Sequence, residues 1–150
     1  VEINGLLENT LNLIRPELNI KSIKAVLKLE KELPEVMAHE SEIGQAFINI
    51  VSNAIEAMPD GGTLTIITQC EQKKGLPLVR IKIIDTGCGI AKNIMDKIFE
   101  PFFSTKKEIK GVGLGLSSSY NIINGCGGKL SVESEEGNGT TFIIDLPINI

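Results

Sequence analysis

The stretch from residue 40 to residue 58 constrains the fold more than any other part of the sequence. Its hydrophobic residues recur with helical spacing and occupy most of the helix surface, so this helix has to be covered by other elements. The apolar positions are Ala46, Phe47, Ile50, Val51, Ala54, Ile55 and Met58. Ser41 is a candidate N-cap, and the sequence MPDGG at 58–62 predicts the end of the helix through its Pro and Gly residues.

Helical and strand-like segments alternate along the rest of the chain. Apolar spacing predicts a helix over 4–18, with Leu6, Leu7, Leu11, Leu13, Ile14 and Leu18 expected on one face. We expect strands at 22–29, 63–69, 78–85, 129–135 and 140–147, a short helix at 91–97, an irregular stretch at 101–112 and a helix at 114–124. This order predicts a two-layer α/β sandwich, in which a mixed, mostly antiparallel sheet of about five strands carries helices on one face.

Composition narrows the class of protein. The chain has 150 residues and a net charge of −4, which argues against a general nucleic-acid binder. No apolar run is long enough to cross a bilayer, and neither a signal peptide, a repeat nor a linker is visible, so we expect one domain over 1–150. The first residue is not Met, so we expect a piece of a longer protein. Cys70, Cys88 and Cys126 fit no metal pattern and are expected as partly buried fillers in a reducing cytoplasm.

A polar stripe runs along the otherwise apolar 40–58 helix. Gln45, Asn49 and Asn53 stand four residues apart on one face, with Glu56 beside them. Asparagine is a poor helix former, and buried amides need partners. The stripe fits either the solvated edge of an amphipathic helix or a row of carbonyl oxygens that face a ligand such as Mg²⁺.

The sequence IKIIDTGCGI at 81–90 places Asp85 at the end of a predicted strand, followed by Gly87 and Gly89. This motif fits an ordinary turn. It also fits a ligand site in which the glycines clear space and the carboxylate accepts a hydrogen bond from an amine such as that of adenine.

An aromatic cluster follows in IFEPFFSTK at 98–106, where Phe99, Phe102 and Phe103 surround a proline. It fits a small satellite core or an aromatic anchor for a mobile segment. Lys106 and Lys107 come directly after it and are suited to approach an anion.

Glycines at every second position precede the helix at 114–124, in IKGVGLGLSSSYNII at 109–123. The stretch is neither a Walker A loop, since no Gly-Lys-Ser/Thr follows, nor a dinucleotide fingerprint, since the spacing differs. It fits a flexible hinge, or a loop whose free amides at a helix N-terminus attract phosphate.

In this order, the four motifs resemble the catalytic ATP-binding domain of bacterial sensor histidine kinases. Asn-x-x-x-Asn-Ala, Asp-x-Gly-x-Gly, Phe-x-Pro-Phe-Phe and Gly-x-Gly-x-Gly-Leu match the family's N box, first glycine box, F box and second glycine box. The closing GNGTTFIIDLP is similar to the family's last strand, and the resemblance covers residues 2–147. It implies the two-layer Bergerat fold of the GHKL superfamily, which includes gyrase. It also implies a kinase that binds Mg-ATP and donates the γ-phosphoryl group to a histidine in two-component signalling.

The resemblance implies roles for individual residues. Asn53 would coordinate Mg²⁺, Asn49 would lie close to the phosphates, and Asp85 would accept a hydrogen bond from the adenine amine. Thr140 would support the adenine side through water, and residues 100–112 would form a lid over ATP. The other implied nucleotide contacts are Gly87, Gly89 and Ile90 at the adenine, Lys106, Gly111, Gly113 and Gly115 at the phosphates, and Leu114 and Leu116 packed beneath them.

The sequence departs from the family pattern in two respects. Many members carry a basic residue where this chain has Glu56, so a phosphate contact is in doubt, and Lys106 is expected to compensate. The single histidine, His39, lacks the surroundings of a phosphoacceptor and is expected at the surface or as a cap. The acceptor histidine is then expected in a dimerisation hairpin outside this chain, from which residues 1–20 are a candidate continuation. A response regulator would be an indirect partner, and neither nucleic acid nor a membrane is expected to touch this cytoplasmic domain.

Two other functions stay open. A superfamily relative that phosphorylates a partner serine is one, although the F box and the short lid favour the histidine kinase. A non-catalytic nucleotide-sensing or protein-binding module is the other, and the intact Asn53, Asp85 and glycine boxes speak against it. In gyrase-like relatives a Glu stands at the position of Asn49. Because Asn cannot take a proton, we expect no rapid hydrolysis of ATP.

Overall fold

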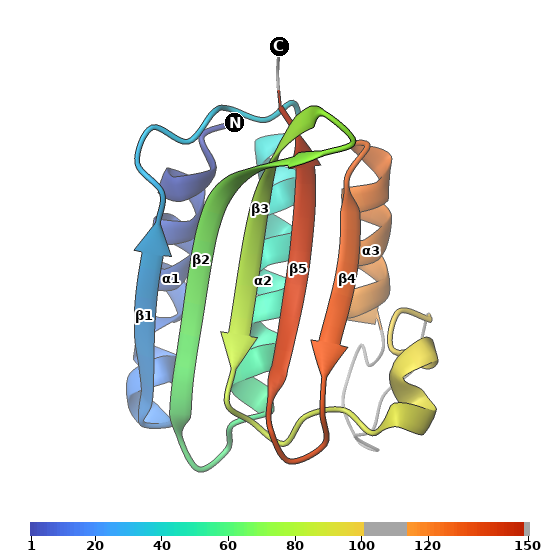
Figure 1. The fold of residues 1–150 in the computed structure, drawn as a ribbon. Helices are drawn as coiled ribbons and strands as arrows, with labels where there is room; N and C mark the ends of the chain where they lie inside the picture. Colours follow the sequence, from blue (N-terminus) through green and yellow to red (C-terminus); the bar gives the residue numbers. More distant parts are fainter. Residues whose placement is uncertain (101–113, 149–150) are drawn as a thin grey trace.

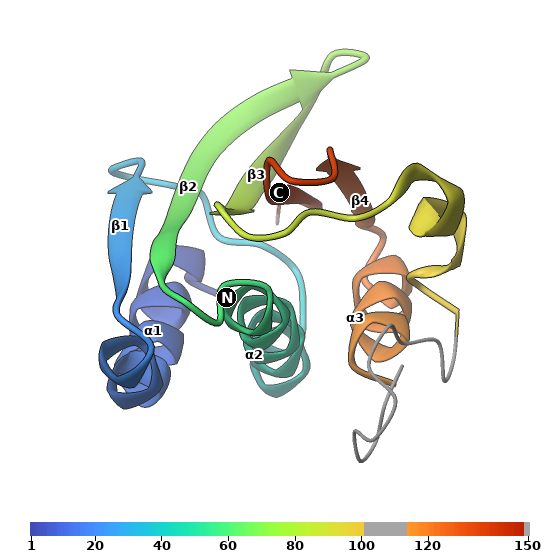
Figure 2. The same cartoon turned by 90° about the horizontal axis from the view of Figure 1, so that it is seen from below.

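The computed structural model of the protein describes residues 1–100 and 114–148. One layer is a five-stranded sheet, and the other consists of the α-helices, which lie together on one face of it (Figures 1 and 2). The elements are α1 (Ile3–Ile20), β1 (Ile23–Leu29), α2 (Glu40–Glu56), β2 (Gly62–Lys73), β3 (Leu76–Asp85), η1 (Lys92–Lys97), α3 (Leu114–Gly125), β4 (Lys129–Ser134) and β5 (Thr140–Pro147). The two-layer α/β sandwich predicted from the sequence is confirmed.

The sheet is mixed, with the strand order β1-β2-β3-β5-β4. β1 pairs with β2 in parallel, and the other three pairings are antiparallel. β2 and β3 form one hairpin, and β4 and β5 form another. In the first, Lys74 and Gly75 make the turn with positive φ angles of 52° and 79°. β5 lies between β3 and β4, so the β4–β5 hairpin joins the sheet through its second strand.

The core fills the space between the sheet and α2. On β3, Val79, Ile81 and Ile83 alternate with half-buried residues and are fully buried, as period-2 patterning requires of a sheet with one covered face. Phe47 of α2 and Phe142 of β5 are also completely buried. Each large side chain of this kind contributes about 1.5–3 kcal/mol through burial, so the central strands and α2 hold the two layers together.

Three expectations need correction. Leu13 does not join the apolar face of α1 and is 72% exposed; at about 100° per residue it stands roughly opposite Leu11. Ser41 does not cap α2, because the helix begins at Glu40 and the N-cap position belongs to His39, whose exposed side chain makes no capping bond. Cys70 and Cys88 are exposed rather than partly buried. Among the described residues, no helix is both long enough and apolar enough to cross a bilayer.

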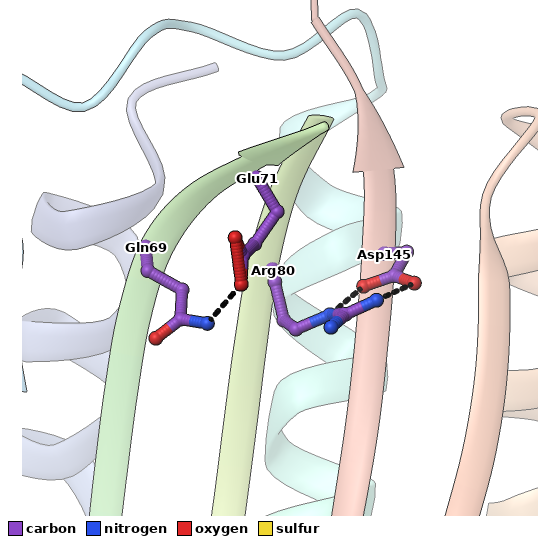
Figure 3. Close-up of polar contacts among 4 residues, drawn as sticks. All are labelled: Gln69, Glu71, Arg80 and Asp145. Atoms are coloured by element: carbon purple, nitrogen blue, oxygen red, sulfur yellow. Dashed lines mark hydrogen bonds and ion pairs between the residues drawn. The ribbon is translucent and has the colours of Figure 1, made fainter. Parts of the chain in front are cut away.

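The outer face of the sheet, which no helix covers, carries paired polar side chains (Figure 3). Arg80 of β3 donates to Asp145 of β5 through two hydrogen bonds, of 2.7 Å and 3.0 Å. The two side chains are 29% and 12% exposed. On β2, Gln69 donates to Glu71 at 2.7 Å. These contacts keep the outer surface polar where the inner surface is apolar.

Candidate functional site

Asp85 lies at the C-terminal end of β3, directly opposite Thr140 at the start of β5. The residue is 3% exposed. Its Oδ1 accepts hydrogen bonds from the backbone N–H of Gly87 at 2.9 Å and from that of Thr140 at 3.2 Å. Oδ2 accepts no hydrogen bond from the residues that the structure describes. A buried carboxylate is therefore held by one oxygen, which leaves the other for a ligand donor.

Burial is the main influence on the acidity of this group. Removal from water raises the pKa of Asp85 above its ordinary value of 3.8, and the N–H groups of Gly87 and Thr140 act against that rise. Keeping a carboxylate in such a place is unfavourable for folding. Groups with perturbed pKa values of this kind cluster at functional sites.

Two glycines of the 85–90 loop permit close approaches between backbones. A Cβ atom on Gly87 would lie 2.3 Å from the carbonyl oxygen of Ala57, the residue that ends α2. The N–H of Cys88 donates to that oxygen at 3.1 Å. Gly89 has a φ of 73°, and a Cβ there would lie 2.2 Å from the carbonyl oxygen of Glu135. Glycine at both positions thus joins the loop to α2 on one side and to the β4–β5 turn on the other.

Ser134 connects the loop to Thr140. Its Oγ accepts from the N–H of Ile90 at 2.8 Å, donates to the carbonyl oxygen of Gly139 at 2.9 Å and lies 2.8 Å from Oγ1 of Thr140. Because the serine proton is used on Gly139, the Thr140 hydroxyl is the donor to Ser134. Ser134 is not among the residues predicted from the sequence. The sequence pattern that could have indicated it is a polar residue at an inward-facing position of β4, after Leu130 and Val132 on the same face.

The polar stripe of α2 faces α3 in part. Asn49 donates through Nδ2 to the carbonyl oxygen of Gly115 at 3.3 Å, and its Oδ1 accepts from Nε2 of Gln45 at 2.9 Å. Asn53 is half-buried, and its side-chain amide has no hydrogen-bond partner among residues 1–100 and 114–148. Asn53 stands one helical turn before Ala57, whose N–H donates to its backbone oxygen at 3.2 Å. Asn53 therefore lies next to the point where α2 meets the Gly87 loop.

The structure thus brings most of the predicted residues together at one end of the sandwich (Figure 1). Hydrogen bonds join Gly87 and Thr140 to Asp85, and Ser134 joins Ile90 to Thr140. Gly89 lies in the same loop, which the bond from Cys88 to Ala57 connects to the end of α2 after Asn53. Gly115 lies in the first turn of α3 next to Asn49. Leu114 begins that helix, and Leu116 packs against the core. Lys106, Gly111 and Gly113 lie outside the described residues.

One member of the aromatic cluster has a described position. Phe99 stacks on Tyr120 of α3 with the ring centroids 5.1 Å apart, and meets the buried Phe142 edge-on at 6.5 Å. Phe102 and Phe103 lie outside the described residues. Phe99 therefore anchors the chain directly after η1 to the core.

The family model described as Histidine kinase-, DNA gyrase B-, and HSP90-like ATPase matches residues 38–150. The sensor histidine kinase ZraS of Escherichia coli (strain K12) is 37% identical over 150 residues, which is all of this chain and 31% of ZraS. The chain thus spans about a third of the length of this curated relative.

Solved structures agree with the fold. The catalytic domain of histidine kinase ThkA matches with a TM-score of 0.85 and 32% identity, over 99% of this chain and 93% of that one. ThkA in complex with the response regulator protein TrrA matches with a TM-score of 0.81 and 29% identity, over 99% and 41% of the two chains. Full-length ShkA in complex with AMPPNP matches with a TM-score of 0.84 and 30% identity, over 99% and 30%.

Proposed function

This chain belongs to the family of histidine kinase-, DNA gyrase B- and HSP90-like ATPases, and on that premise we propose that it is the ATP-binding catalytic domain of a sensor histidine kinase. It would bind Mg-ATP and donate the γ-phosphoryl group to a histidine of a dimerisation hairpin outside residues 1–150, with residues 1–20 leading from that hairpin. The phosphoryl group would then pass to a response regulator. We place this activity in the cytoplasm.

The observation that carries the proposal is the buried Asp85 carboxylate with one oxygen held by two N–H groups and the other left for a ligand. A buried acceptor of this kind is complementary to the exocyclic amine of adenine. Gly87, Gly89 and Ile90 would border the base, and Thr140 would support it from β5.

The residues present also fit a magnesium ion carried by the nucleotide. The described residues form no cluster of three or more His, Cys, Asp or Glu side chains that would hold a metal by itself. Mg²⁺ typically takes one or two protein oxygens and completes its shell with water and substrate phosphates, and the amide of Asn53 offers one such oxygen. When bound, Mg²⁺ neutralises charge on the phosphates. Asn49, Lys106, Gly111, Gly113 and Gly115 would contact the phosphates, with Leu114 and Leu116 packed beneath them.

In the proposed reaction an imidazole nitrogen of the acceptor histidine attacks the γ-phosphorus of ATP. The bond from that phosphorus to the β–γ bridging oxygen breaks, and ADP leaves. Phosphoryl transfer requires positioning and charge neutralisation more than covalent participation by the protein. Asn49 cannot accept a proton from water, so we expect the domain alone to hydrolyse ATP slowly.

Calorimetric titration with Mg-ATP tests the nucleotide site. Asp85→Asn places an amide NH₂ group where the adenine amine needs an acceptor. The loss of a hydrogen bond to a charged group costs about 1.5–3 kcal/mol, so we expect the affinity for Mg-ATP to fall roughly 10–100-fold. Asp145→Asn is the matched control, because Asp145 is also largely buried but lies on the outer face of the sheet. Unchanged affinity in Asp85→Asn, or an equal loss in both variants, would contradict the assigned role of Asp85.

Mixing the domain, Mg-ATP and the dimerisation hairpin of the parent kinase tests the transfer. We expect an acid-labile phosphohistidine on the hairpin and no phosphoserine. ATP binding without any phosphohistidine would favour a non-catalytic nucleotide-sensing module instead.

A further inference from the structure

A second concave site lies at the end of the α2–α3 pair that is remote from Asp85. The two helices run antiparallel, since Gly115 at the start of α3 contacts Asn49 and Ser119 contacts Ala46 nearer the start of α2. Where α2 begins and α3 ends, the surface is hollowed into a cavity of about 490 Å³, which we call the distal groove. The residues that line it include Met37, Glu42, Ile43, Ile122, Gly125 and Cys126.

Gly125 has no structural reason to be glycine. It is the last residue of α3, its φ lies outside the left-handed region, and a Cβ added there would meet nothing within 4 Å. The left-handed position that ends the helix belongs to Gly127, with a φ of 82°. Glycine at a helical position costs about 0.5–1 kcal/mol relative to alanine. The absence of a side chain at Gly125 instead leaves room in the groove for a group from outside the chain to approach closely.

The groove offers apolar contacts that the chain itself does not use. Met37, at its rim, is 62% exposed. Ile122 is only partly buried, and Ile43 closes the floor. Methionine adapts its shape to different partners and recurs at protein-binding surfaces. A volume of this size takes a few side chains of a partner segment rather than a whole helix.

The charges around the groove are of one sign. No Lys or Arg lines it, whereas Glu42 does, and Glu40 stands in the same first turn of α2. The last turn of α3 contains no basic residue, so the partial negative charge of that helix end is not neutralised from within the helix. Burial, and to a smaller extent the Glu42 carboxylate, raises the pKa of the Cys126 thiol, so the thiol stays neutral and adds no charge. A partner that fits this field carries a cation.

We propose that the distal groove docks a segment of a partner protein that presents an aliphatic side chain next to a lysine or arginine. The aliphatic group enters between Met37 and Ile122 over Gly125, and the cation faces Glu42. This site is separate from the nucleotide site, because Ile43 and Asn53 are ten residues apart on α2, which is about 15 Å along a helix. Residues of α2 and α3 contribute to both sites, which lie at opposite ends of this helix pair.

The test is a titration of the ¹⁵N-labelled chain with three capped ten-residue peptides, followed by NMR. The first alternates leucine and lysine, the second has serine in place of every leucine, and the third has glutamate in place of every lysine. We expect the first peptide alone to shift resonances, and to shift those of the groove, including Gly125 and Cys126. Shifts spread over other acidic parts of the surface, or equal shifts with the serine peptide, would overturn the proposal.

Matched variants make the test specific. Glu42→Lys should weaken binding of the first peptide about tenfold, the factor that one charge-assisted contact supplies, while Glu8→Lys, the same charge change on the exposed face of α1, should not. Gly125→Phe should abolish binding by filling the groove, and Gly125→Ala should preserve most of it. Equal effects of Glu42→Lys and Glu8→Lys, or full binding by a folded Gly125→Phe protein, would contradict the site. Thermal unfolding of each variant identifies any loss that comes from misfolding.

Discussion

Around Asp85 backbone groups make most of the contacts, whereas around Asn49 the side-chain amides of Asn49 and Gln45 make them. The first region is held by the N–H groups of Gly87 and Thr140 and by glycines that lie against neighbouring carbonyl oxygens. The second depends on a chain of two hydrogen bonds from Gln45 through Asn49 to Gly115. The proposed adenine side is therefore rigid and intolerant of substitution, while the proposed phosphate side can be adjusted one amide at a time.

The largest expected effect comes from disturbing the backbone contacts. Gly139 has a φ of 90°, and a Cβ there would lie 2.2 Å from the carbonyl oxygen of Asp85. Gly137 has a similar φ of 87°, but nothing lies within 4 Å of its added Cβ. Gly137→Ala should cost about 1–2 kcal/mol through the left-handed conformation alone, whereas Gly139→Ala adds about 1–3 kcal/mol for the overlap.

Urea unfolding measures both glycine variants. Calorimetry with Mg-ATP should also show weaker binding for Gly139→Ala than for Gly137→Ala. The added Cβ overlaps the carbonyl oxygen of Asp85, and relief of that overlap moves residue 139 and, with it, the neighbouring Thr140. Equal unfolding free energies would mean that the β4–β5 turn yields easily and that this side of the site is not rigid.

A smaller effect is expected on the amide side. The carbonyl of Gly115 fixes Nδ2 of Asn49 toward α3, which leaves Oδ1 toward Gln45. Gln45→Glu sets a carboxylate against that oxygen and should turn the Asn49 amide, with a loss of ATP affinity of about tenfold. Gln45→Ala removes the donor without repulsion and should lose less. If stability falls while ATP affinity stays constant in both variants, the hydrogen bonds serve helix packing only.

At Asp85 the requirements of ligand binding and of folding stability conflict, because the buried carboxylate that would bind a ligand lowers the free energy of unfolding. Its pKa is raised in the folded chain, so the folded state holds the proton more tightly than the unfolded state, and stability falls as pH rises from the ordinary value of 3.8 through the folded value. Asp85→Asn should therefore unfold at a higher urea concentration than the parent at pH 7, with the gain shrinking toward pH 4. A parent protein more stable than Asp85→Asn at pH 7 would mean that the two N–H bonds outweigh the cost of burial.

The smallest effect is expected on the outer face of the sheet. Arg80→Met breaks a partly exposed ion pair and leaves Asp145 without its partner, which should cost about 1 kcal/mol. Glu71→Gln keeps an acceptor for Gln69 and should change the unfolding free energy by less than about 0.5 kcal/mol. Neither variant should alter ATP affinity. A change in that affinity would connect the outer face to the site.

The local parts of this structure follow from local patterns. Alternating residues in β3 and the Lys74–Gly75 turn predict the first hairpin, and apolar spacing predicts α2. The position of β5 between β3 and β4 depends on contacts between distant segments, which no periodicity encodes. The prediction for Leu13 was wrong because it did not take the angle between successive helical residues into account. The prediction for Ser41 was wrong because the first helical residue is set by the backbone conformation, which the side-chain type alone does not determine.

The candidate site divides in the same way. The Asp-x-Gly-x-Gly motif predicts the position of Asp85 at the end of β3, because a carboxylate and glycines that follow a strand lie in one segment of the sequence. Ser134 was missed because its partners Ile90 and Gly139 come from two different turns. The distal groove was not predicted from the sequence for the same reason, since residues 37–43 and 121–126 meet only in the folded chain. The nucleotide and metal roles assigned to all of the site residues stay predictions, and Lys106, Gly111 and Gly113 also lie outside the described residues.

The central place of β5 also matters while the protein is being made. Asp85 and Thr140 are partners across the sheet although they are 55 positions apart. Until β5 has left the ribosome, β3 presents an open strand edge, of the kind that pairs with other chains. A nascent chain that stops before Thr140 lacks the donor that holds Asp85 from β5, so the synthesis of β5 both protects this edge of β3 and completes the carboxylate's surroundings.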